Sequence, residues 1–177
     1  MQLRGHGIRA ELPGGWEGAI RVEPVAADAA EGQLAAAAAE QTAPVVHLAT
    51  FALPADRGDF GSGAVDLMDD GDAFVALLEY GPDEVDTPLF AARGLPRRLD
   101  PRNFSGRSLQ RAMRRQAGWQ HFFTESGRAF CLYVVLGDRG DANRQVRRVE
   151  EVLARIEIEE VLAQVEIEPA TTGEQHR

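Results

Sequence analysis

The sequence predicts an α+β domain with a single, mainly antiparallel β-sheet of about six strands packed by helices. Three observations carry this prediction. Short apolar runs alternate with turn residues, Gly14-Gly15 and Ser126-Gly127 lie where hairpin turns are expected, and residues 143–154 have the spacing of an amphipathic helix. Hairpins favour antiparallel pairing, because parallel neighbours need a crossover of about a dozen residues or more.

The N-terminal half contains four expected strands. The first alternates apolar and charged residues, which is the period of a half-buried strand, and the turn Pro13-Gly14-Gly15 follows it. Trp16, at that turn, is expected to fill one end of the core. The fourth strand is almost continuously apolar, which is typical of a strand covered on both faces. The four strands are predicted at residues 8–12, 19–22, 45–53 and 74–80.

The C-terminal half contains the clearest hairpin, residues 119–125 and 128–136, followed by the amphipathic helix. Before the hairpin, three prolines prevent residues 82–118 from forming one helix. The expected core residues are Ile8, Leu12, Ile20, Val22, Val46, Leu48, Phe51, Val75, Leu77, Phe122, Phe130, Leu132, Val134, Val149 and Leu153.

One domain over residues 1–158 accounts for these elements, with an alanine-rich insertion at residues 25–43. Residues 159–177 are interpreted as a C-terminal extension. It carries the second copy of a duplicated nonapeptide, whose copies span 150–158 and 159–167. Nine residues turn a helix by about 900°, so two copies on one helix cannot face the same core. The second copy is either a product of coding-sequence slippage or a docking or oligomerisation element.

The composition excludes several chemistries. All 19 basic residues are arginine, so a Schiff-base lysine and a P-loop lysine cannot occur. Cys131 is the single cysteine, which excludes an intramolecular disulfide and a multi-cysteine metal site. The formal net charge of −9 argues against a general nucleic-acid or acidic-membrane binder. With neither a signal-peptide pattern nor an apolar run of about 20 residues, we expect a soluble, cytoplasmic protein.

Residues 56–86 form an acidic segment, in which ten carboxylates accompany one arginine. Its densest part surrounds Gly71. Hard cations such as Ca²⁺ take several oxygen ligands from one loop, but this spacing does not match an EF-hand. We therefore expect a solvated loop and no metal.

Residues 93–115 form an arginine segment, with eight arginines and one acid. Guanidinium groups bind phosphates and carboxylates in a bidentate manner, and a neighbouring aromatic ring can stack on a base. Three readings are open: pairing with the acidic segment within one chain or across a dimer, binding of an anionic ligand, and binding of nucleic acid. The candidate ligand-binding residues are Arg107, Arg111, Arg114, Arg115 and Trp119.

The histidines and Cys131 are candidates for a catalytic or metal-binding set. His121 and Cys131 lie on the two strands of the hairpin, and a Cys–His pair can form a thiolate. The apolar neighbours of Cys131 instead favour core packing. His47 and His121 could join an aspartate around a metal, but the sequence lacks a helical pair of histidines. Glu79 and Glu125 have no evident partner acid.

The order of elements, with the Leu12–Trp16 turn, the 119–136 hairpin and a terminal helix ending in Ile-Glu-Ile, resembles the PsbP-like α/β/α sandwich. This superfamily includes photosystem extrinsic proteins and Ran-binding import factors. The resemblance covers roughly residues 5–158 and implies a binding or assembly role. It transfers no functional residue, because none of the family's functional motifs occurs in this sequence.

We therefore expect a non-catalytic binding or assembly protein without a cofactor. Its partner would be a protein, a second copy of the chain, or an anionic small ligand. The alternative is a small hydrolase or transferase with a carboxylate and arginine site in residues 54–118.

Overall fold

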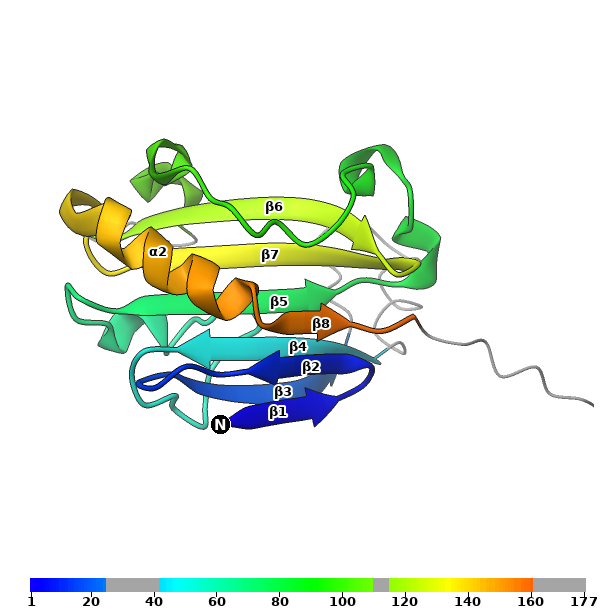
Figure 1. Cartoon of the computed structure of the whole chain (residues 1–177), viewed down its shortest axis with the longest axis horizontal. Helices are drawn as coiled ribbons and strands as arrows, with labels where there is room; N and C mark the ends of the chain where they lie inside the picture. The colour runs from blue at the N-terminus through cyan, green and yellow to red at the C-terminus, as the bar shows by residue number, and fades with distance from the viewer. Residues whose placement is uncertain (25–41, 110–114, 161–177) are drawn as a thin grey trace, which may run out of the picture.

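The computed structural model describes residues 1–24, 42–109 and 115–160. The α+β class is confirmed: the described residues form eight strands and one α-helix (Figure 1). In chain order these are β1 (Gln2–Gly5), β2 (Ile8–Glu11), β3 (Glu17–Pro24), β4 (Thr42–Ala49), β5 (Ala73–Glu79), β6 (Ala117–Glu125), β7 (Arg128–Leu136), α2 (Ala142–Leu153) and β8 (Ile156–Ile158).

The main sheet has five antiparallel strands in the order β3-β4-β5-β7-β6. The predicted hairpin is confirmed, because Glu125 pairs with Arg128 and the strands diverge only at Ser126 and Gly127. Both turn residues have positive φ, 53° and 69°. This is the geometry of the two-residue turn whose twist matches paired strands.

The expectation of one sheet of about six strands is wrong, because β1, β2 and β8 form a second sheet of three strands. The turn at Gly14-Gly15 carries the chain from one sheet to the other, so it does not form a hairpin. The actual hairpin joins β1 to β2 through His6 and Gly7, whose φ angles are 51° and 69°. Figure 1 shows the small sheet in front of β3 and β4, in one layer with α2.

The two faces of the main sheet are covered differently. The small sheet, α2 and residues 95–104 cover one face, and the residues of this core include Val149 and Ile156. The other face lies under residues 51–68, with Phe74 and Cys131 in its core. The expectation that several helices pack on the sheet is therefore wrong for the described residues, which contain one α-helix. The remaining helical elements are the 3₁₀ turns Val65–Leu67, Pro82–Glu84, Pro88–Phe90, Pro101–Asn103, Gly106–Ser108 and Arg139–Asp141.

Most expected core residues are buried, and Trp16 is buried as predicted. Ile20, Phe51 and Phe122 are half-buried, and Val22, on the edge strand β3, is exposed by 45%. Residues 25–41 of the expected insertion lie outside the described residues, and its last two residues already belong to β4. The C-terminal extension is described only at Glu159 and Glu160. Within the described ranges, no helix has the length and apolar character needed to cross a membrane.

Candidate functional site

The arginine segment leaves the edge of the main sheet and returns to it. At one end of β6, the N–H of Thr124 donates to Ala92 and that of Gly94 donates to Thr124, at 2.8 and 2.9 Å. At the other end, Ser105 and Gly118 exchange two hydrogen bonds of 3.0 Å. Between these anchors the chain crosses the sheet face, where Leu95, Leu99 and Phe104 enter the core. The backbone of this connection is therefore held at both ends and in the middle.

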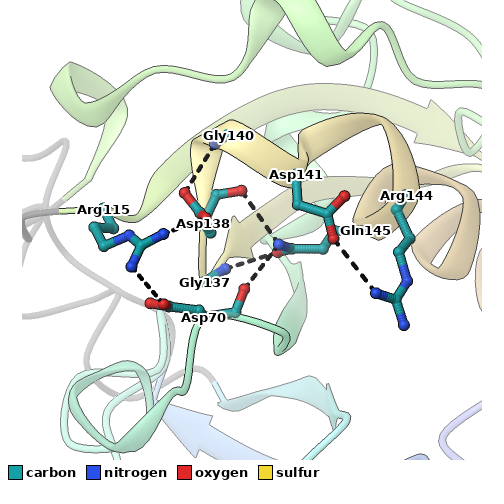
Figure 2. A network of polar contacts seen from close by, with 8 residues as sticks. All are labelled: Asp70, Arg115, Gly137, Asp138, Gly140, Asp141, Arg144 and Gln145. Carbon is teal, nitrogen blue, oxygen red and sulfur yellow. Dashed lines mark hydrogen bonds and ion pairs between the residues drawn. The ribbon is translucent and has the colours of Figure 1, made fainter.

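Two arginines of the segment pair with the acidic segment, as predicted. Arg93 lies 2.7 Å from Asp86, and Arg115 lies 2.6 Å from Asp70. Arg115 also donates to Asp138 at 2.7 Å (Figure 2). These pairs join consecutive connections of one chain, so pairing within the chain is sufficient to explain them.

For three other arginines the pairing prediction is wrong. Arg97 donates to the backbone oxygen of Leu153, and Arg98 donates to Glu150 at 3.3 Å. Arg102 forms a short-range pair with Asp100, in which the side-chain hydrogen bonds hold the pKa of Asp100 at about 2. The middle of the segment approaches α2 because its apolar residues pack there. The guanidinium groups in this part of the segment therefore bond to α2 or to a neighbouring residue of the segment.

The candidate ligand-binding residues are only partly brought together. Arg107 is exposed, and its N–H donates to the Ser105 hydroxyl at the end of β6 nearest Trp119. Trp119 is half-buried between Phe104 and His121, with ring centroids at 6.1 and 5.4 Å. Arg115 is directed to the acidic segment. Arg111 and Arg114 lie outside the described residues.

A polar junction around Gln145 holds Asp70 and Asp138 close to Arg115 (Figure 2). Gln145 is buried, donates to the backbone oxygens of Asp70 and Asp138, and accepts from the N–H of Gly137 at 2.9 Å. The N–H of Gly140, and next Arg115, lower the pKa of Asp138. The sequence pattern does not indicate this role for Gln145, because a glutamine among helical polar residues normally faces solvent.

His47 and the hairpin residues do not form a catalytic set. In the neutral tautomer, Nε2 of His47 donates to the backbone oxygen of Asp59 at 2.6 Å and Nδ1 accepts from Arg57. Burial lowers the pKa of His47 to about 4. Cys131 lies opposite Phe122, whereas His121 lies opposite Leu132, so the two side chains point to different sheet faces. Burial raises the pKa of Cys131 to about 12, in agreement with core packing.

Both glutamates without an evident partner acid have structural partners. Glu79 forms a bidentate pair with buried Arg128, and Glu125 accepts from the N–H of Leu95 at 2.5 Å. Arg128 also donates to three backbone oxygens of the small-sheet region, which makes it the main polar link between the two sheets. Among the described residues, no group of three or more acids, histidines or cysteines is arranged to hold a metal.

Comparisons with known proteins give no match: no family model, curated protein or solved structure matches this chain. The resemblance to the PsbP-like superfamily therefore stays a prediction. The arginine segment and the adjoining β6 remain as the candidate site, defined by geometry alone.

Proposed function

We propose that this chain is a non-catalytic binding or assembly protein that takes an acidic partner on its arginine segment. One observation carries the proposal. Residues 93–105 of the segment are anchored at both ends to β6, and this stretch displays Arg98 and Arg102 to solvent, with side chains exposed by 91% and 89%. A pre-formed cationic surface binds an acidic partner without first ordering its own chain.

The ion pairs at this surface leave room for a partner. Arg98–Glu150 and Arg102–Asp100 are pairs with exposed guanidinium groups, and such pairs contribute only about 0–1 kcal/mol each. A carboxylate or phosphate of a ligand can therefore compete for the same groups. Arg107 forms no ion pair with any described residue and adds a further cation.

A binding role is also favoured over the alternative hydrolase or transferase by the buried polar groups. Glu79, Arg128 and Gln145 are engaged by protein partners that hold the fold together. His47 likewise uses both ring nitrogens within the protein. These groups are therefore committed to structural contacts.

Binding of fluorescent polyglutamate, measured by anisotropy, tests the proposal. We expect binding that weakens as salt rises, because the contact is electrostatic, and that is lost when Arg98, Arg102 and Arg107 are all changed to Glu. The triple variant Arg139→Glu, Arg144→Glu and Arg147→Glu, at exposed positions on α2 and just before it, changes the net charge equally. It is the matched control and should weaken binding far less. Equal loss in both variants would mean that net charge alone, rather than this surface, governs binding.

A further inference from the structure

The edge of the main sheet at β6 is open only in its middle. In an antiparallel strand, successive residues direct their backbone groups alternately to one neighbour and to the other side. Gly118 and Thr124 direct theirs away from β7, because they bond to Ser105 and to Ala92 and Gly94. The same alternation directs the backbone groups of Gln120 and Phe122 outward.

Within the part of the chain that the structure describes, these two residues have no strand partner on that side. Among the described residues, none bonds to the outward N–H or C=O of Gln120 or Phe122. Gln120 is exposed and Phe122 is half-buried. Figure 1 shows the reason, since the chain that anchors both ends of β6 runs across the front of the sheet between them. Within residues 1–24, 42–109 and 115–160, the four outward backbone groups are thus unpaired, as on an uncovered sheet edge.

Arginines stand at both ends of this opening. Arg93 forms a parallel bridge with Thr124, and its side chain is 69% exposed. Arg107 belongs to the 3₁₀ turn that follows the Ser105–Gly118 bridge. The side chains of Trp119 and Phe122 add half-buried aromatic surface on the two faces of the strand. The opening thus offers hydrogen bonds in the middle and the Arg107 cation at one end. At the other end Arg93 is paired with Asp86 at 2.7 Å, an exposed pair for which an acidic residue of a ligand can compete.

We propose that β6 binds a short, extended, acidic peptide segment of a partner protein as an added strand. The inference rests on the proposed function and specifies how the partner is recognised. From Gly118 to Thr124 the strand spans about 20 Å, which suits about three to five peptide residues between the two anchors. Main-chain hydrogen bonds to Gln120 and Phe122 would supply affinity, and acidic residues near the peptide ends would select the orientation.

A labelled, end-capped peptide Glu-Val-Thr-Val-Glu is the probe. A second peptide of the same sequence carries N-methyl groups on its three central amides, which keeps the charges but removes the strand donors. We expect the first peptide to bind at least about tenfold more tightly than the second. Hydrogen exchange should slow at the amides of Gln120 and Phe122 when the first peptide binds.

Charge-reversal variants complete the test. Arg93→Glu and Arg107→Glu should each weaken binding of the first peptide, whereas Arg147→Glu should leave it nearly unchanged. Equal binding of both peptides, or no slowing of exchange at Gln120 and Phe122, would overturn strand addition. If polyglutamate binds and neither peptide does, strand addition is also overturned, but the proposed function stands. If no acidic probe binds, both proposals fail.

Discussion

Replacement of Arg128 by methionine should lower the free energy of unfolding, because it removes the hydrogen bonds that link the two sheets. Arg128 is 5% exposed and donates to Glu79 through Nε at 2.8 Å. It also donates to the backbone oxygens of His6, Gly7 and Glu159, at 2.9, 3.4 and 3.3 Å. Methionine preserves the apolar stem but removes every donor, so Glu79 and the carbonyl groups of His6 and Glu159 lose Arg128 at once. The Gly7 oxygen keeps one donor, the N–H of Glu159 at 2.8 Å.

The expected loss follows from the burial of the pair. Removing one member of a buried ion pair costs about 3–5 kcal/mol, because the other charge is left unpaired. A domain of this size is stable by about 5–15 kcal/mol in total, so the free energy of unfolding should fall by about a fifth or more. At about 2–4 °C per kcal/mol, the melting temperature should fall by about 6–20 °C.

Urea unfolding followed by circular dichroism measures the loss, with Arg147→Met on the exposed side of α2 as the control. The double variant Arg128→Met with Glu79→Leu should recover only part of the stability. It removes the unpaired carboxylate but does not restore the hydrogen bonds that Arg128 donates to the carbonyl groups of His6 and Glu159. A single variant within about 1 kcal/mol of the wild type would refute the argument that Arg128 links the sheets, because a removed buried partner should cost about 3 kcal/mol or more.

Three further predictions concern single residues and the repeat. His47 has a folded pKa of about 4 against an ordinary value of 6.5, so the unfolded chain binds the proton first. The contribution of neutral His47 to stability is therefore fully present above about pH 6.5, and about 3 kcal/mol of it is lost as the pH drops to 4. His47→Gln should remove this pH dependence when unfolding is measured across that range. Gly137→Ala should destabilise the fold strongly, because a Cβ there would lie 2.1 Å from the backbone oxygen of Asp69, whereas Gly14→Ala meets nothing and should be nearly neutral in thermal melts. Deletion of residues 150–158 brings the second copy of the nonapeptide into their place, with Val165 at the position of Ile156. The chain should therefore still fold. Because valine is one methylene smaller than isoleucine, urea unfolding should show a loss of only about 1 kcal/mol in the free energy of unfolding.

Much of the local structure could be predicted from the residues themselves. The Ser126-Gly127 hairpin and the helix at 142–153 depend on side chains a few positions apart, and both occur where the pattern predicted them. Cys131 could likewise be assigned to the core from its apolar neighbours. Local turn chemistry was insufficient at Gly14-Gly15, because the same residues can reverse a strand or pass the chain to another layer.

Only the tertiary structure decided the partners of strands and charges. The pairing of β2 with β8 joins residues almost the whole chain apart, and no local pattern encodes such a contact. The arginine segment shows the same limit for the candidate site. Its sequence predicted a cationic surface, but the destination of each guanidinium group depends on where Leu95, Leu99 and Phe104 anchor the backbone. The physical reason is that side-chain period and turn preference act over a few residues, whereas burial and charge pairing are settled between elements brought together by the whole fold.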